Sequence, residues 1–261
     1  AMSIFAVGGN VGFAVGPALT TGALLLWGLK GTLILVVPVT IMALVLVSQR
    51  SAFTAMQLSS PRRQAESAPS LGQDEWFPFI RLSGAVICRS IIFYGLNTFL
   101  PLYWIHVFNQ SKAAGGTALS ILFGTGIVAT LLGGRLADRY GHRKIVLAGF
   151  GALIPLLFIF ITMDNVNGAT ALLIPIGFAL FASFSPMIVM GQRYLPNRVG
   201  LASGITLGVA VSVGGIVAPL FGRIADNHGI PAALTGVAAF SIIALLLAFT
   251  LPAPRLARKK Q

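Results

Sequence analysis

The chain has 261 residues, of which 56% are hydrophobic and only 9% are charged, and its mean hydropathy is +0.89. A soluble domain carries roughly 25% charged residues. The composition therefore excludes a soluble enzyme and a disordered chain, and it predicts a protein that crosses a membrane several times. The net charge of +12 does not predict nucleic-acid binding, because the basic residues form short clusters between long apolar runs.

Eight apolar runs are long enough to cross a bilayer, which requires about 20 residues in a helix. Their continuity and length predict an all-α membrane protein rather than the alternating strands of a membrane barrel. The predicted spans are Met2–Leu26, Gly31–Val47, Phe79–Ile105, Ala114–Gly133, Ile145–Met163, Ala169–Gln192, Gly200–Phe221 and Pro231–Leu251.

The loops between these spans differ in their charge. Fourteen Lys and Arg residues lie on one side of the predicted membrane and three, Lys30, Lys112 and Arg223, on the other. Cytoplasmic loops retain Lys and Arg, so we expect the segment Ser48–Pro78, the loop around Arg139 and the C-terminal tail to be cytoplasmic. We expect the protein to reside in the inner, or cytoplasmic, membrane.

The segment Ser48–Pro78 is the only linker of any length, and its Ser, Pro, Gln and charged residues predict a flexible surface connection. A weak internal repeat relates the first and seventh spans, because an offset of 202 superposes Gly12 on Gly214 and Pro17 on Pro219. Each of these spans is followed by one more span and then by a basic segment, so we infer a parallel repeat of six helices. The predicted domains are the last two helices of an N-terminal half (1–47), the linker (48–78), a complete C-terminal half (79–251) and a basic tail (252–261). Four further helices are expected upstream.

The loop between the fourth and fifth spans, GGRLADRYGHRK, carries the most specific motif. It resembles the cytoplasmic signature G-x-x-x-D-[RK]-x-G-[RK]-[RK] of the major facilitator superfamily. The matching residues are Gly134, Asp138, Arg139, Gly141 and Arg143; His142 replaces one basic residue, and Lys144 follows the motif. The resemblance implies a major-facilitator-type helical bundle, with eight of an expected twelve transmembrane helices present in this chain. We interpret the motif as a reversible gate latch: the glycines allow a tight turn, and the aspartate can pair with arginine and with a helix N-terminus.

The first span carries a second resemblance. Drug–proton antiporters of the same superfamily have a glycine-rich stretch ending G-x-x-x-G-P, which Gly12, Gly16 and Pro17 match, although Thr20 and Thr21 replace a glycine pair. This small-residue face is expected to pack closely against the opposite half. The stretch AMSIFAVGGNVGFAVGPAL is similar to the fosmidomycin-resistance branch of drug exporters, which implies proton-driven export of small drugs, including a phosphonate antibiotic.

Arg89 is the only charged residue well inside a predicted span. An arginine at this depth costs at least about 2.5–3.5 kcal/mol, so we expect it to face a water-filled cavity or a partner. At 100° per residue Asn97 lies 80° from Arg89 and Tyr94 lies 140° from it. A guanidinium suits a phosphonate or carboxylate, and Arg89 is therefore predicted to bind the anionic group of a substrate. The substrate-binding candidates are Arg89, Asn97, Tyr94, Asn10 and Gln192, the last two being more typical of hydrogen bonds between helices.

The sequence contains few residues that could couple transport to protons or catalyse a reaction. No Asp or Glu lies inside a predicted span, so a proton-coupling group is expected in the upstream helices. The segment Gly222–Gly229 repeats part of the signature without its basic residues, and we interpret it as an ordinary helix end. We find no nucleotide-binding loop, no metal-ligand cluster and no catalytic set that could converge. The chain is therefore not expected to be an enzyme, and no cofactor is expected beyond a proton gradient.

Three functional hypotheses follow. The leading one is a secondary transporter that exports small drugs by alternating access. Its expected substrates include anionic, phosphonate-like compounds. The alternatives are a nutrient or metabolite uptake symporter with the same fold and a truncated membrane module that does not transport, because fold alone does not decide direction. The expected partners are a small-molecule substrate, the lipid bilayer and the four missing N-terminal helices; nucleic acid is not expected, and the full-length protein is expected to be a monomer.

Overall fold

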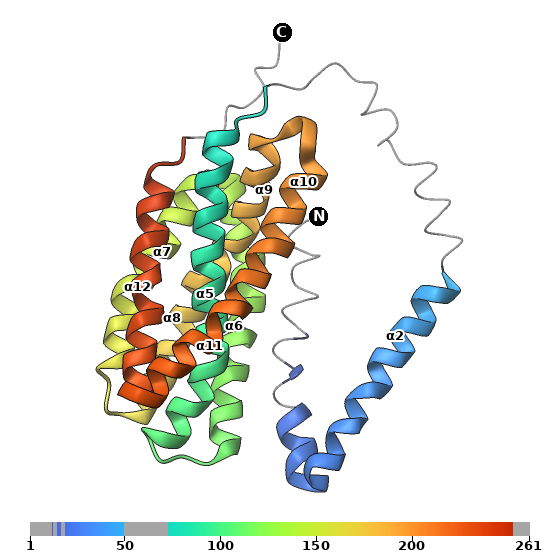
Figure 1. Cartoon of the computed structure of the whole chain (residues 1–261), viewed down its shortest axis with the longest axis vertical. Coiled ribbons are helices and arrows are strands. Elements are labelled where there is room, and N and C mark those ends of the chain that lie inside the picture. Colours follow the sequence, from blue (N-terminus) through green and yellow to red (C-terminus); the bar gives the residue numbers. More distant parts are fainter. Residues whose placement is uncertain (1–11, 13–14, 17–18, 50–72, 253–261) are drawn as a thin grey trace.

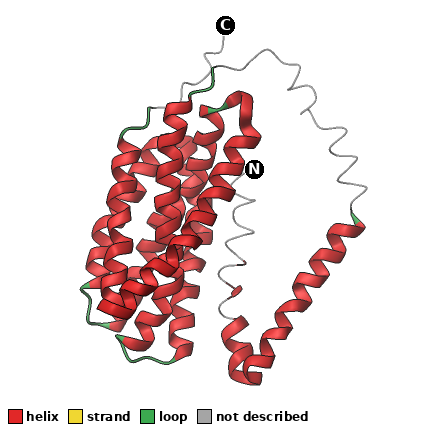
Figure 2. Ribbon diagram, viewed as in Figure 1, coloured by secondary structure: helices red, strands yellow, loops and turns green. Residues whose placement is uncertain are grey.

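The computed structural model describes residues 12, 15–16, 19–49 and 73–252, and all regular secondary structure within these residues is helical (Figures 1 and 2). The elements are η1 (Gly28–Leu35), α2 (Val36–Ser48), α5 (Trp76–His106), α6 (Lys112–Tyr140), α7 (His142–Ile161), α8 (Val166–Ala182), α9 (Phe184–Tyr194), η2 (Pro196–Arg198), α10 (Val199–Ser203), η3 (Gly204–Val209), α11 (Ala210–His228) and α12 (Ile230–Phe249).

Six helical runs in this part of the chain are long and apolar enough to cross a membrane. They are Trp76–His106, Lys112–Tyr140, His142–Ile161, Val166–Tyr194, Pro196–His228 and Ile230–Phe249. They match the last six predicted spans in order, which confirms the prediction of a helical membrane protein. The six runs lie side by side as one bundle (Figure 1).

The second predicted span, Gly31–Val47, is wrong as a single membrane-length helix. The structure divides this region into the eight-residue 3₁₀ helix η1 and the 13-residue α2, whose apolar part Val36–Val45 is too short to cross. Gly28, which has a positive φ of 61°, begins the 3₁₀ segment. Apolarity alone could not reveal this, because it does not specify the backbone turn. The first predicted span lies only partly within the described residues.

Turn and cap residues explain where the helices of the bundle end. The Ser111 hydroxyl accepts a hydrogen bond from the Ala114 amide at the start of α6, and the Asn165 side chain accepts one from Asn167 at the start of α8. Gly141 separates α6 from α7 with a φ of 101°, a conformation that residues with a Cβ rarely adopt. Gly229 separates α11 from α12 in the same way.

Two of the membrane-length runs are irregular. The run Val166–Tyr194 is interrupted at Ser183, between α8 and α9, and Pro186 follows. Because proline has no amide hydrogen, the Ala182 carbonyl loses its donor within the helix. The run Pro196–His228 contains η3, a six-residue π-helical segment between α10 and α11. Such segments occur frequently at functional sites.

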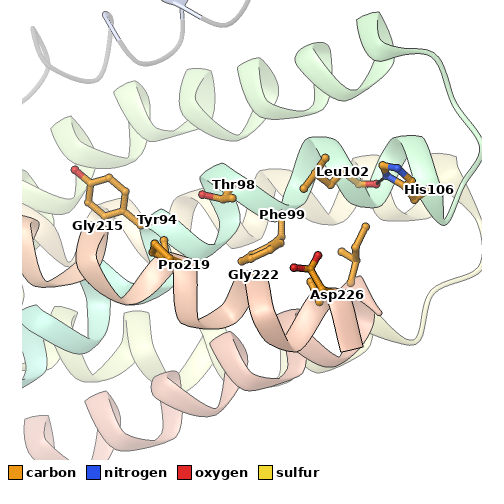
Figure 3. A pocket seen from close by; sticks show the side chains of 12 residues that line it. Tyr94, Thr98, Phe99, Leu102, His106, Gly215, Pro219, Gly222 and Asp226 are labelled. Carbon is orange, nitrogen blue, oxygen red and sulfur yellow. Dashed lines mark hydrogen bonds between the residues drawn. The ribbon is translucent and has the colours of Figure 1, made fainter. Parts of the chain in front are cut away.

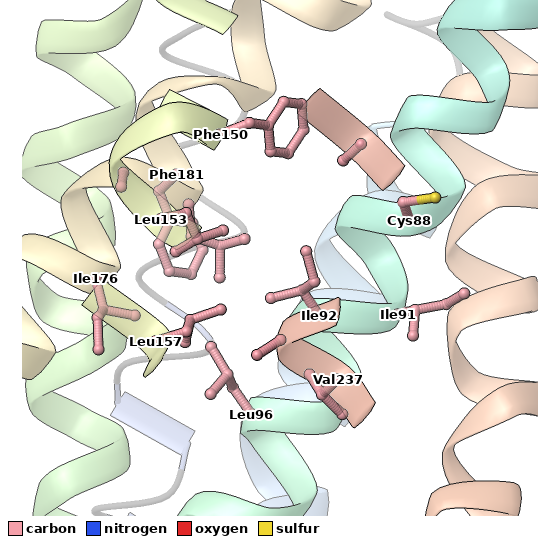
Figure 4. Packing of buried hydrophobic residues seen from close by; sticks show 14 of the residues in the cluster. Cys88, Ile91, Ile92, Leu96, Phe150, Leu153, Leu157, Ile176, Phe181 and Val237 are labelled. Carbon is pink, nitrogen blue, oxygen red and sulfur yellow. The ribbon is translucent and has the colours of Figure 1, made fainter. Parts of the chain in front are cut away.

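α5 lies at the centre of the bundle and packs against α6, α9, α11 and α12. Its buried side chains Ile92 and Leu96 meet Leu153, Leu157 and other apolar residues of α7, α8 and α12 (Figure 4). The α6 and α8 backbones approach so closely near Gly133 that a Cβ there would overlap the Ala182 carbonyl group. This close approach requires glycine at position 133.

η1 and α2 stand outside this bundle (Figure 1). α2 packs on η1, and apolar side chains such as Val39 and Leu44 are exposed along it. The described residues before η1 approach the bundle at Gly116 of α6, where a Cβ would lie 2.6 Å from the Thr21 hydroxyl oxygen. Assignment of this region to a second six-helix half stays a prediction.

Candidate functional site

A cavity of about 730 Å³ lies between α5, α11 and the start of α12 (Figure 3). Most of its wall is apolar or aromatic, and two ionisable side chains, His106 and Asp226, lie at one end of it. The lining residues are Tyr94, Thr98, Phe99, Leu102, His106, Gly215, Ala218, Pro219, Gly222, Ala225, Asp226 and Ile230. A mostly apolar wall with few polar groups is the common form of a small-molecule site, and the volume lies within the usual range.

The helical spacing of α11 explains how it lines this cavity. Gly215, Pro219, Gly222 and Asp226 are separated by four, three and four residues, which places them on one face of the helix. The small residues on this face leave room beside α5. Asp226 extends from α11 into the space between the two helices (Figure 3).

The two ionisable groups differ in their bonding. The His106 Nδ1 atom lies 3.1 Å from the Leu102 carbonyl oxygen, which can only accept, so Nδ1 donates and Nε2 of the neutral ring is an acceptor. Within the described residues no hydrogen bond or ion pair engages the Asp226 carboxylate, and Arg223, one turn earlier on α11, does not pair with it. The cavity therefore presents an exposed carboxylate that makes no hydrogen bond or ion pair with the described residues.

Arg89 does not line this cavity. Its side chain is 5% exposed, and Nε donates a hydrogen bond of 3.0 Å to the carbonyl oxygen of Leu180. This carbonyl belongs to the last turn of α8, where backbone acceptors lack intrahelical donors and the helix dipole favours a positive charge. The guanidinium carbon also lies 4.4 Å from the centroid of the Phe184 ring and 5.8 Å from that of Phe181. The expectation that Arg89 has a partner is met by a carbonyl and two rings rather than by a cavity.

The remaining substrate-binding candidates that the structure describes have different surroundings. Tyr94 lines the cavity, as its position 140° from Arg89 allows, whereas Asn97 is half-buried and does not line it. Gln192 of α9 donates a hydrogen bond to the Ser203 hydroxyl of α10, which fits the predicted role between helices. Asn10 lies outside the described residues. Their roles in binding stay predictions, and of the four candidates that the structure describes Tyr94 alone lines the cavity.

The motif loop forms the turn between α6 and α7. Gly141 supplies the predicted tight turn, and the close helix approach occurs at Gly133, next to the predicted Gly134, which is buried. Asp138 is exposed, and the ionisable side chain that lies beside it among the described residues is His142 (3.7 Å) rather than an arginine. The structure thus places the non-matching residue of the motif beside its aspartate.

The basic residues of the motif point to different surroundings. Arg143 donates a hydrogen bond of 2.8 Å to the Phe249 carbonyl oxygen at the end of α12. Arg139 lies over the Tyr140 ring, and Lys144 is exposed. Arg143 therefore caps another helix, and the gating role of the motif stays a prediction.

Several contacts join the helix ends on this side, which we call the Arg143 end of the bundle. Arg81 of α5 donates to the Thr250 carbonyl, and the Tyr194 hydroxyl donates to the Pro252 carbonyl at 2.6 Å. Asp74 accepts from the Asn197 amide and lies 3.6 Å from Arg198. The loops that the charge distribution assigns to one side thus meet at one end, opposite His106.

The packing motif of the first span is only partly described. Gly12 is exposed and Gly16 half-buried, and a Cβ on either would meet no atom within 4 Å. Pro17 lies outside the described residues. Packing of this face against other helices stays a prediction.

Sequence analysis missed Asp226, because the segment Gly222–Gly229 was interpreted as a helix end. The end itself is confirmed: α11 stops at His228, and Gly229 has a φ of 86°. The signal that could have revealed the site is the row of small residues at spacings of four and three that leads to Asp226. It marks a face of α11 that bulky side chains do not fill.

The bundle, its cavity between membrane-length helices and its glycine-containing basic turn define a polytopic membrane protein of the transporter type. The sequence profile of the Major Facilitator Superfamily matches residues 1–219, and the chain belongs to this superfamily of transporters. It is 28% identical to the uncharacterized MFS-type transporter YfnC of Bacillus subtilis (strain 168), with 99% of this chain and 64% of YfnC covered.

A second relative carries a functional name. The chain is 27% identical to the fosmidomycin resistance protein of Escherichia coli (strain K12), with 88% of this chain and 57% of that protein covered. A shorter match, 34% identical over 70 residues, relates it to the MFS-type transporter YwfA of Bacillus subtilis. The chain thus spans less than two thirds of the length of YfnC and of the fosmidomycin resistance protein.

Proposed function

We propose that this chain belongs to a secondary active transporter that exports small drugs across the bacterial inner membrane by alternating access. The α5–α11 cavity carries the proposal, since it is a small-molecule-sized space between membrane-length helices. The similarity to a fosmidomycin resistance protein supports export as the direction. A proton gradient is the proposed energy source.

The proposed orientation places the Arg143 end in the cytoplasm, together with the linker and the C-terminus. Its support is the excess of Lys and Arg in the segments that meet there. In this orientation His106 and Asp226 lie toward the outer face of the membrane. A substrate in the cavity would then be close to its release side.

An anionic, phosphonate-like substrate is a second candidate, tied to Arg89. Binding an anion there would require the guanidinium to leave the Leu180 carbonyl and move out from the Phe184 ring. A bidentate anion could replace these contacts with stronger, charge-assisted hydrogen bonds. The proposal therefore makes Arg89 a group that changes partner between conformations.

Drug efflux from cells that express the protein tests the proposal. Expression should lower the accumulation of exported compounds, and collapse of the proton gradient with an uncoupler should abolish this effect. Asp138→Asn should reduce efflux about tenfold without altering the amount of membrane-inserted protein, because the Asp138 carboxylate is exposed and its loss disturbs little packing.

The matched control is Asp164→Asn, which removes another exposed carboxylate, outside the motif. Its efflux should equal that of the wild type. Equal accumulation in expressing and non-expressing cells would contradict export. Normal efflux by Asp138→Asn at wild-type expression would contradict the gating role.

A further inference from the structure

Arg89 and Asp226 have opposite surroundings: Arg89 is buried, whereas Asp226 is exposed in the last turn of α11. Arg89 is enclosed and already has a carbonyl and two aromatic rings as partners. Asp226 is exposed at the end of the cavity, and the described residues provide it with no hydrogen bond or ion pair. The charge that is available to a ligand in this structure is therefore negative.

The rest of the cavity wall suits a cation with an apolar body. Tyr94 and Phe99 contribute aromatic rings, whose faces attract positive charge. Thr98 offers a hydroxyl, and His106 in its neutral form adds an acceptor rather than a positive charge. Neither Lys nor Arg is among the lining residues that the structure describes.

The length of the cavity suits a cation with an apolar body. Tyr94 and His106 are twelve residues apart on α5, which corresponds to about 18 Å along the helix. Between them the wall is formed by Phe99, Leu102 and the small residues of α11. An amphipathic molecule could place its apolar part there and its charge beside Asp226.

We infer that the α5–α11 cavity binds amphipathic organic cations, with Asp226 as the residue that selects their charge. The inference rests on the proposed transport function, because it names the substrate class of the same cavity. It differs from the anionic substrate that Arg89 suggested in the sequence. Removal of the carboxylate should weaken cation binding and leave the apolar wall unchanged.

Tetraphenylphosphonium and tetraphenylborate form a suitable probe pair, since they share size and shape and differ in the sign of their charge. Equilibrium dialysis against the purified whole chain in detergent, with protein-free micelles subtracted, should show tighter binding of the cation. Asp226→Asn should weaken tetraphenylphosphonium binding about tenfold and affect tetraphenylborate little. Asp164→Asn, which removes an exposed carboxylate that does not line the cavity, should bind both as the wild type does.

The outcomes separate the inference from the proposed function. Equal or tighter binding of tetraphenylborate, or equal effects of Asp226→Asn and Asp164→Asn, would overturn the inference even if the cells export drugs. Selective, Asp226-dependent binding of the cation would support it even if no transport were detected, and only the transport proposal would then fail. A folding defect of Asp226→Asn is controlled by its circular dichroism, and Asp226→Glu should retain most of the cation affinity.

Discussion

Arg89 and Asp226 are both charged residues of membrane-length helices in one bundle, yet the bundle treats them in opposite ways. Arg89 lies on the face of α5 that meets the break between α8 and α9, and it is a structural part of that contact. Asp226 lies on the face of α11 that leaves a cavity beside α5. The comparison teaches that the fold itself can supply the partners of a charge deep in a helix, whereas a carboxylate at a cavity stays available to a ligand.

The largest expected effect comes from removal of the buried charge. Arg89→Ala should destabilise the bundle by about 3 kcal/mol, because it removes the hydrogen bond to Leu180, the contact with Phe184 and the packing of the side-chain stem. Asp226→Asn should change stability by less than about 0.5 kcal/mol. Thermal unfolding in detergent, followed by circular dichroism, measures both; equal losses would remove the distinction between the two sites.

A smaller effect should distinguish the close α6–α8 contact at Gly133 from the cavity face of α11 at Gly215. Gly133→Ala should cost about 2 kcal/mol, because the new Cβ would overlap the backbone of Ala182. Gly215→Ala adds the same methyl group where no atom lies within 4 Å, so its stability should match or slightly exceed that of the wild type. Similar unfolding midpoints for the two variants would mean that α6 and α8 are not in close contact.

The smallest effect should come from the hydrogen bond between Arg143 and the end of α12. Arg143→Gln should lose about 1 kcal/mol, because the Phe249 carbonyl at the end of α12 loses its charged donor. Lys144→Gln removes a charge from an exposed position and should be neutral. If both variants unfold like the wild type, the contact between Arg143 and α12 contributes nothing to stability.

The sequence predicted the helical membrane fold because span length and apolarity follow directly from bilayer thickness. The last six spans were identifiable for this reason, whereas the 3₁₀ segment before α2 depends on local backbone geometry at Gly28 that apolarity does not encode. The tight turn at Gly141 was predictable from its motif, since glycine there has a positive φ. The division into two six-helix halves stays a prediction.

The candidate site was less accessible to sequence analysis. The helical angle correctly separated Arg89 from Tyr94, but it could not tell which of the two faces meets a cavity. The partner of Arg89 is a backbone carbonyl 91 residues away, and backbone groups leave no residue-specific trace in a sequence. Asp226 was hidden by its position near a helix end, although the small residues on its face of α11 point to it.

The π-helical segment η3 has a consequence for the chemistry of the cavity. A π-turn accommodates one more residue than an α-turn, which changes the angular register of everything that follows by about 100°. Asp226 follows η3 on the same continuous run, so its direction toward α5 depends on the backbone of Gly204–Val209. If that segment tightened into regular α-helix while α11 stayed helical, the carboxylate would rotate away from the cavity. The charge presented to a ligand would then change without any helix leaving the bundle.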